Sequence, residues 1–289
     1  MKIRAIQDYQ EVEAVEALQR VVWPGSAVDI VPAHLLSAIE RNGGILLGAY
    51  IEDELVGFVM GFLAVDEASP SSVAAGKLKH SSHMLGVHPE HRDKGIGYQL
   101  KLAQRRLLQD QGIRLATWTY DPLVSRNAYL NIHRLGATVK NYLVSAYGEM
   151  RDELNRGMSS DRFEVEWWLT SSRVSIRIEG DRPPLDLANY RAAGTVKVNP
   201  ATLDKKGLLR PPGEVAPLAG NLMLVEIPAD ITQIKAQDPG LAEAWRHHTR
   251  SIFLDAFEQG YIVTDFLHLS REQFPRSYYL LSYGEGTLG

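Results

Sequence analysis

The chain of 289 residues contains no cysteine. This absence excludes disulfide bonds, thiolate metal ligands and a cysteine nucleophile, and it agrees with a reducing compartment. No stretch approaches the roughly 18 consecutive apolar residues that a membrane-spanning helix needs. The N-terminal residues also lack the apolar core of a signal peptide. We therefore expect a cytoplasmic protein that has no membrane partner.

An excess of basic residues is also missing, since 31 Lys and Arg stand against 35 Asp and Glu, for a net charge of −4. Without a positive field the chain is not expected to bind nucleic acid. The hydrophobic content of 45% and the charged content of 23% are those of an ordinary globular protein.

The first 170 residues alternate between strand and helix patterns. Asp8 is placed to cap a helix that directs five apolar residues toward a core: Val12, Val15, Leu18, Val21 and Val22. A second helix is expected over 32–41, and an antiparallel hairpin turns at Glu52–Glu54. Strands follow at 80–87, 113–120, 137–148 and 163–171, with helices at 96–112 and 125–136. This order predicts an α/β fold with a mixed sheet and helices on both faces.

The regular alternation of strand and helix patterns ends after residue 170, and residues 181–220 are rich in proline and glycine. A strand at 221–231, a helix at 239–259 and strands at 261–269 and 277–282 come next. We therefore expect two domains, 1–171 and a smaller α/β extension, 172–289. The role of the extension stays open between a homodimer contact, a lid over the acceptor and a degenerate duplicate of the first domain.

The stretch "GVHPEHRDKGIGYQLKLAQRRLLQDQG" places Gly95 and Gly97 at the start of an amphipathic helix. The apolar stripe is expected at Ile96, Leu100, Ala103 and Leu107, with Lys101 and Gln104 among the polar residues on the other face. A helix N-terminus offers unpaired amide hydrogens, and glycines there let an anion approach the backbone. A plain glycine turn is the alternative. A dinucleotide fingerprint is disfavoured, because a third glycine and an acidic ribose ligand are missing.

The same stretch resembles motif A of the GNAT acyltransferase superfamily, which reads Arg or Gln, two residues, Gly, one residue, Gly or Ala. Arg92, Gly95 and Gly97 match this motif in register. "LGVHPEHR" resembles the family's preceding strand, and "NAYLNIHRLGA" resembles its later helix. The order of elements agrees over about the first 170 residues, so the resemblance implies a GNAT-like, mostly antiparallel central sheet.

The resemblance implies that an acyl-CoA, acetyl-CoA by default, binds between two splayed parallel strands, 83–87 and 114–120. Backbone groups of Leu85 and Val87 would hold the pantetheine arm, and Asn127 would contact it. Arg92 and the amides from Lys94 to Tyr98 would bind the pyrophosphate, which includes Gly95, Ile96 and Gly97. An acceptor amine would attack the thioester directly, and no metal is implied.

The sequence departs from the family where a tyrosine often acts as the acid, because Ile132 stands there. Tyr129 is the alternative acid, or a packing residue, and we expect it on the same buried helix face as Ile132. For the base, His83 is preferred over His80, with a water chain or no role as alternatives. The four histidines between His80 and His91 lack the acidic support of a metal site.

The acceptor is expected beneath the charged loop 149–162, where Arg151, Arg156 and Arg162 are candidates for binding its carboxylate. The alternative is a solvated loop. The sequence thus predicts an acyl-CoA-dependent N-acyltransferase for a small-molecule amine such as an amino acid. Succinyl or another acyl group is a variant, and a catalytically inactive CoA-binding regulatory module is the alternative from another class. A modifier of nucleic acid or ribosomal protein is weaker, because the chain is acidic.

Overall fold

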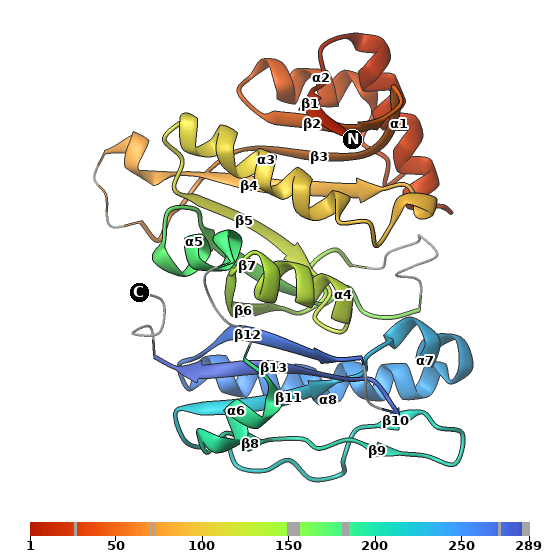
Figure 1. Ribbon diagram of the computed structural model, residues 1–289, viewed down its shortest axis with the longest axis vertical. Coiled ribbons are helices and arrows are strands. Elements are labelled where there is room, and N and C mark those ends of the chain that lie inside the picture. The colour runs from red at the N-terminus through yellow and green to blue at the C-terminus, as the bar shows by residue number, and fades with distance from the viewer. Residues whose placement is uncertain are drawn as a thin grey trace. The chain divides into compact units, whose positions relative to one another are not determined.

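The computed structural model describes residues 1–25, 28–69, 71, 73–148, 157–180, 185–270 and 273–284. These residues pack as two compact units. The first unit contains the described residues of 1–118 together with 168–170. The second contains the described residues of 119–148, 157–167 and 171–284. Figure 1 labels the elements of both units.

The sheet of the first unit has the order β1-β2-β3-β4-β5. Its strands are β1 (Lys2–Ala5), β2 (Ile45–Ile51), β3 (Glu54–Val65), β4 (Leu78–Val87) and β5 (Leu115–Tyr120). Successive strands pair antiparallel up to β4, and β4 pairs parallel with β5. The predicted hairpin turns at Glu52 and Asp53, whose φ angles are 49° and 68°.

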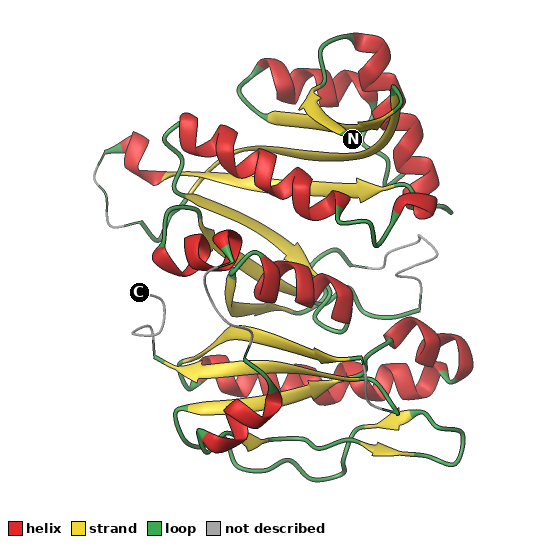
Figure 2. Ribbon diagram, in the orientation of Figure 1, coloured by secondary structure: helices red, strands yellow, loops and turns green. Residues whose placement is uncertain are grey.

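Helices cover both faces of this sheet, as Figure 2 shows. The helices are α1 (Tyr9–Val22), α2 (Ala33–Arg41) and α3 (Ile96–Asp110), with short turns η1 (Ala74–Lys77) and η2 (Pro89–His91). Phe58 and Met60 of β3 pack against α1 and α2. Gly57, which precedes Phe58, faces Ile96 and Leu100 of α3 on the other side, because side chains alternate along a strand.

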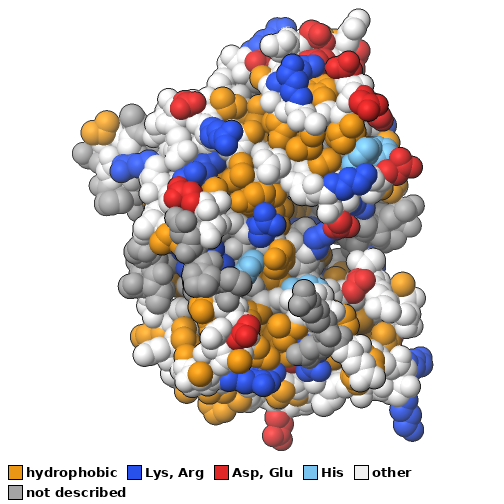
Figure 3. Space-filling model, in the orientation of Figure 1, with side chains coloured by type: hydrophobic (Ala, Val, Ile, Leu, Met, Phe, Trp, Pro, Cys, Tyr) orange, Lys and Arg blue, Asp and Glu red, His pale blue; other side chains and the backbone are white. Residues whose placement is uncertain are grey.

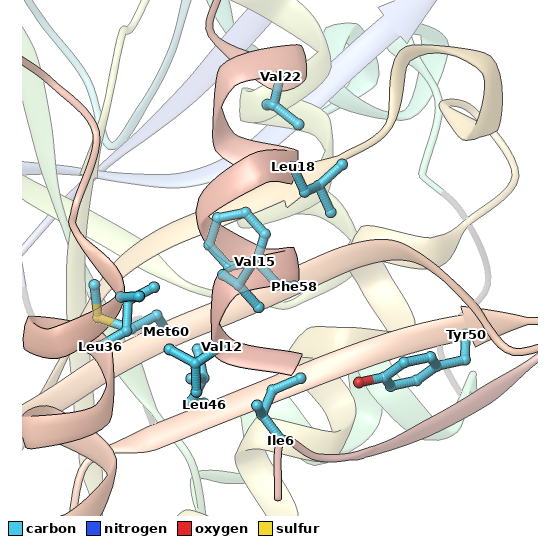
Figure 4. Packing of buried hydrophobic residues seen from close by; sticks show 11 residues of the cluster. Ile6, Val12, Val15, Leu18, Val22, Leu36, Leu46, Tyr50, Phe58 and Met60 are labelled. Atoms are coloured by element: carbon cyan, nitrogen blue, oxygen red, sulfur yellow. The ribbon is translucent and has the colours of Figure 1, made fainter. Parts of the chain in front are cut away.

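The predicted α1 helix is confirmed, with Asp8 accepting a hydrogen bond from the Glu11 amide at 2.9 Å. Its buried stripe points at β2 and β3 in Figure 4 and consists of Val12, Val15, Leu18 and Val22. Val21 was expected in this stripe but is 45% exposed. It lies one residue off the helical repeat that the other four share.

The second unit contains a sheet of order β7-β6-β12-β13-β11-β8 and the pair β10-β9. The strands are β6 (Thr138–Leu143), β7 (Arg162–Trp168), β8 (Val196–Lys197), β9 (Thr202–Leu203), β10 (Leu209–Arg210), β11 (Leu222–Ile227), β12 (Tyr261–Leu269) and β13 (Arg276–Tyr283). Helical segments are α4 (Ser125–Ala128), η3 (Tyr129–Arg134), α5 (Ser172–Glu179), α6 (Leu187–Ala192), α7 (Ile231–Gln237) and α8 (Pro239–Glu258). The long helix expected over 239–259 is confirmed, whereas α5, α6 and α7 were not predicted.

Alternate residues of β13 face different helices of the second unit. Tyr278 packs in a cluster with Leu187 and Tyr190 of α6. Tyr279 instead contacts Phe253 of α8, with ring centroids 5.4 Å apart. The second unit therefore also has helices on both faces of its sheet, and the predicted α/β class with a mostly antiparallel sheet is confirmed.

The two packing units divide the chain differently from the expected boundary at 171/172. The C-terminal strand β12 pairs with β6 through Val263 and Val139, so β6 packs with elements of the extension. The division into domains 1–171 and 172–289 stays a prediction.

Among the described residues, no helix is long and apolar enough to cross a membrane. On the face drawn in Figure 3, basic and acidic side chains are interspersed.

A test of the packing around β4 is the substitution Gly61→Ala. A Cβ at Gly61 would collide with the imidazole of His80 and lie 2.5 Å from the Ser81 carbonyl oxygen. We expect the free energy of unfolding to fall by about 1–3 kcal/mol, measured by urea denaturation. Gly57→Ala is the matched control on the same strand, since its Cβ would meet atoms only at 3.2 Å or more. Equal losses for both variants would contradict the packing described here.

Candidate functional site

Strands β4 and β5 pair over a short distance. The register joins His80 with Ala116 and Ser81 with Thr117, and no further pair follows along these fully described strands. The pairing of the two strands thus ends early, as expected for the gap between parallel strands that the resemblance implies.

A β-bulge in β4 lies where this pairing ends. Met60 pairs with Met84 and Phe62 with Ser81, so Ser82 and His83 together oppose Gly61. A bulge bends its strand and disrupts the local ladder. The bulge thus gives a physical reason why β4 turns away from β5 after Ser81.

The backbone of β4 directs Leu85 and Val87 toward the gap. The His88 amide donates to the Val56 carbonyl at 2.9 Å, which defines a hydrogen-bonded pair with β3. Because such pairs alternate along an antiparallel ladder, Gly86 also faces β3, and the residues between point their amides and carbonyls the other way. This is the orientation that an added strand-like ligand would need.

The glycine turn leads into α3 beside the open end of the gap. Gly95 is the N-cap residue with φ of 78°, and its carbonyl accepts from the Gln99 amide at 3.1 Å. Ile96 and Gly97 form the first turn, whose amides have no partner within a helix. The positive φ explains why this residue is glycine. A steric clash does not explain it, because nothing lies within 4 Å of a Cβ placed at Gly95. Conformation, not steric space for an anion, is the stronger reason.

The remaining predicted pyrophosphate ligands lie in the same loop. Lys94 is exposed and Tyr98 is half-buried. Arg92 contacts the carbonyls of Val87 and Val22, each at 3.4 Å. Arg92 thus ties the loop to β4 and α1, and a direct role in binding phosphate stays a prediction.

The buried face of α3 is rotated from the one expected. Lys101 and Gln104 are 3% and 0% exposed, whereas Leu107 is 39% exposed and Ala103 is half-buried. The prediction counted apolar residues only. It missed that polar partners on β4 draw Lys101 and Gln104 inward.

These side chains form a buried network with β4 and β5. The Lys101 ammonium donates to Ser82 Oγ at 2.7 Å and Gln104 Oε1 at 3.2 Å, and lies 3.6 Å from the Trp118 ring centroid. Ser82 Oγ donates to Gln104 Oε1 at 3.0 Å, and Gln104 Nε2 lies 3.1 Å from His80 Nε2. Burial lowers the pKa of Lys101 well below its ordinary value. Burial and the Lys101 charge lower the pKa of His80 to about 3.

His83, the preferred base, is exposed at the bulge, and its ring lies 5.9 Å from that of Phe62. Desolvation lowers the pKa of His83, so the imidazole is neutral at pH 7 and able to accept a proton. Its role as the base stays a prediction.

In the second unit, Asn127 is half-buried in α4 and Tyr129 begins η3. The expectation that Tyr129 shares a buried face with Ile132 is wrong, since Tyr129 is 38% exposed and Ile132 is fully buried. The segment is a π-helix, in which the Leu135 amide donates to the Leu130 carbonyl. Its wider turn places residue i+4 over residue i. The Tyr129 ring therefore stacks on His133, with centroids 4.8 Å apart.

A buried carboxylate that sequence reasoning missed holds this helix. Asp265 of β12 lies 3.3 Å from His133 Nδ1 and accepts from Arg177 at 2.7 Å and Tyr190 at 2.8 Å. Burial would raise the pKa of Asp265, but the His133 hydrogen bond and the Arg177 charge hold it below its ordinary value. A separation of 132 residues left no sequence signal for the pair.

Of the predicted acceptor ligands, Arg151 and Arg156 lie outside the described residues. Arg162 is 7% exposed and donates to the carbonyl of Asp161 at 2.9 Å. Its guanidinium also lies 5.6 Å from the Tyr147 ring centroid. The structure thus places Arg162 inside the second unit, and its proposed contact with a carboxylate is untested.

A second ionic cluster was also missed. Asp161 accepts from Tyr142 at 2.7 Å and from Arg250 at 2.7 and 3.0 Å. The 1% exposed Arg246 pairs with Asp121 at 2.5 Å. Among the described residues, no group of three or more His, Asp or Glu could hold a metal ion.

The short β4–β5 pairing, the bulge and the glycine-capped helix define an α/β domain. Residues 10–133 match the model of the acetyltransferase (GNAT) family, so the chain carries a domain of that family. The resemblance seen at Arg92, Gly95 and Gly97 is confirmed. The matched segment supports the prediction of an N-acyltransferase.

Several solved structures are similar to this chain. The ribosomal-protein-S18-alanine N-acetyltransferase of Escherichia coli shows 10% identity and a TM-score of 0.45 over 59% of this chain and 95% of its own. An aminoglycoside 6'-acetyltransferase type Ii shows 18% identity and 0.43 over 58% and 97%. Arabidopsis thaliana NAA60 with acetyl-CoA shows 15% identity and 0.46 over 58% and 98%. No curated protein sequence matches the chain.

The conformation of Gly95 gives a test of the proposed pyrophosphate site. Gly95→Val forces a β-branched residue into a positive φ, so the first turn of α3 shifts. We expect the Kd for CoA, measured by calorimetry, to rise at least about tenfold if roughly 1.4 kcal/mol of binding is lost. Gly112→Val is the matched control, since Gly112 follows the other end of α3 with φ of 76° and an equally open Cβ position. Equal CoA affinity in the two variants would contradict this site.

Buried His80 gives a pH-dependent test. Its pKa is lowered from 6.5 to about 3 in the folded chain, so the unfolded chain binds the proton first as pH falls. The contribution of the neutral His80 imidazole to the free energy of unfolding is present above pH 6.5 and is lost as pH falls toward 3. The free energy of unfolding then changes by at most about 1.4 kcal/mol per pH unit. We expect His80→Asn to flatten this slope, measured by urea denaturation at several pH values. The control His34→Asn, at an exposed position on α2, should keep the wild-type slope. Parallel pH profiles for the wild type and His80→Asn would refute this.

Proposed function

We propose that the chain transfers an acyl group, acetyl in the simplest case, from acyl-CoA to the primary amine of a small molecule such as an amino acid. The observation that carries this proposal is the divergence of β4 and β5 after Ser81 and Thr117. Leu85 and Val87 direct backbone groups into that gap, and Gly95 starts α3 at its open end. A pantetheine arm fits the first feature and a pyrophosphate fits the second.

The family reaction requires that the amine lose a proton and that the thiolate gain one. We propose His83 at the bulge as the base and Tyr129 as a candidate acid. Asn127 is proposed to contact the pantetheine arm. Arg151, Arg156 and Arg162 are proposed to bind a carboxylate of the acceptor.

The interspersed charge of the visible face and the net charge of −4 argue against a polyanionic acceptor. A small amine acted on in the cytoplasm agrees with the absence of cysteine. We further propose that residues 1–171 form the acyltransferase domain and that 172–289 extend it.

The experiment that tests this function measures thiol released from acetyl-CoA and succinyl-CoA with a panel of amino acids, polyamines and peptides. We expect amine-dependent release with acetyl-CoA and an amino acid, and N-acyl product by mass spectrometry. A preference for succinyl-CoA would overturn the assignment of acetyl as the acyl group. Activity with peptides alone would overturn the assignment of a small-molecule acceptor. Tight CoA binding without release by any amine would contradict the proposal and identify a regulatory module.

Tyr129 can be tested by removing its hydroxyl alone. Tyr129→Phe keeps the ring that stacks on His133, so we expect an unchanged Kd for CoA and a kcat lowered at least about tenfold. Tyr283→Phe is the control, because Tyr283 is an exposed tyrosine elsewhere in the second unit. Unaltered kcat in Tyr129→Phe would make Tyr129 a packing residue.

A further inference from the structure

Lys101 lies at the closed end of the gap between β4 and β5. Ser81 and Thr117 form the last pair that joins the two strands. Ser82 and Trp118 are therefore the first residues beyond it. The Lys101 ammonium contacts both, at 2.7 Å from Ser82 Oγ and 3.6 Å from the Trp118 ring centroid.

The two ends of the gap differ in chemistry. The open end adjoins the α3 N-terminus, where the amides of Ile96 and Gly97 favour an anion. From Val87 back to Ser82 the strand spans roughly 16 Å at about 3.3 Å per residue. An extended pantetheine arm can cover that distance, so a donor with its phosphates at the open end brings its thioester to the closed end.

A proton source is needed at that end, because a thiolate leaving group must be protonated as the thioester breaks. Ile132, at the position where the family often has a tyrosine, carries no ionisable group and is fully buried. On β4, the side chains at the closed end are Ser82, the neutral His80 and His83, which is the proposed base. Lys101 carries ionisable N–H donors and reaches the closed end from α3.

We propose that Lys101, rather than the candidate Tyr129, protonates the thiolate of CoA during acyl transfer, an inference that rests on the proposed function. As the acceptor nitrogen bonds to the acyl carbon, the C–S bond breaks and its electron pair passes to sulfur. Lys101 gives one proton from Nζ to that sulfur and becomes a neutral amine. The amine nitrogen releases one proton to His83, the proposed base, which passes it to water. Lys101 takes one proton back from water, so the reaction balances.

The surroundings of Lys101 suit this role. Its ammonium over the Trp118 ring gains a cation–π interaction that supports the charged form. Gln104 accepts from Lys101 and Ser82 and fixes the direction of the side chain. Burial works against the charge and lowers the pKa of Lys101, which brings it toward that of a thiol. A donor and an acceptor of similar pKa exchange a proton readily.

Several titratable groups lie on the described elements that pack against α3. β4 directs His80 at the network, and Lys101 lowers its pKa, whereas β5 contributes the neutral ring of Trp118. Lys2 and Glu54, at the ends of β1 and β3, are exposed. Arg4 lies over the ring of Tyr50. Lys101 and His80 are therefore the titratable side chains that the hydrogen bonds of this network connect.

The test compares Lys101→Met, Lys101→Arg and the control Lys79→Met, a half-buried lysine on β4. Methionine matches the length of lysine and removes a buried charge, whose loss of hydration is costly. Thermal denaturation checks this. We expect Lys101→Met to lower kcat by about 10²-fold or more, with the Kd for CoA within about twofold. Lys79→Met should keep both values.

The pH profile separates proton donation from structural support. The wild-type kcat should fall as rising pH removes the proton of Lys101. This falling limb should move to higher pH in Lys101→Arg and be absent in Lys101→Met. If the wild type is active and Lys101→Met keeps both its kcat and its falling limb, the Lys101 inference is overturned while the proposed function stands. A parallel loss of kcat and CoA affinity also overturns it, in favour of a binding role. A wild type that releases no thiol from any acyl-CoA overturns the proposed function as well.

Discussion

The early end of the β4–β5 ladder is the constraint on which the first unit depends. Two parallel strands that stay paired bury their backbone groups in each other, whereas these separate after Ser81 and Thr117. The bulge at Ser82 and His83 bends β4 away. The backbone of Leu85 and Val87 is thereby left for a ligand, because exposed strand groups bind whatever completes the ladder. The catalytic proposals depend on this local break in a regular sheet.

A buried lysine beside that break is costly to maintain, since an ammonium removed from water loses several kcal/mol of hydration. The structure offsets part of this cost with Ser82, Gln104 and the Trp118 ring. Gly61 contributes by leaving the space that the His80 imidazole occupies. A protein that needed only a stable core would bury an apolar residue on α3 at this point. The network is therefore better explained by chemistry at the gap than by packing.

Much of the first unit could be predicted because its signals are local. Asp8 caps α1, the acidic turn closes the β2–β3 hairpin, and Gly95 adopts the left-handed conformation at the start of α3. The buried face of α3 was misjudged because apolar periodicity cannot show that Lys101 and Gln104 find polar partners on another strand. The exposure of Tyr129 was misjudged for another reason. A π-helix changes which residues align, and its hydrogen-bond register is not written in residue types.

The contribution of the C-terminal segment was beyond sequence reasoning because it acts through long-range pairing. β12 joins the sheet at β6 through Val263 and Val139. It also carries Asp265, whose carboxylate reaches His133 beneath the Tyr129 ring. Arg177 and Tyr190 donate to the ionised carboxylate of Asp265 and fix its position. Moving it would leave several buried polar groups without hydrogen-bond partners at once. Within the second unit, the C-terminal segment therefore holds the helix that carries Tyr129.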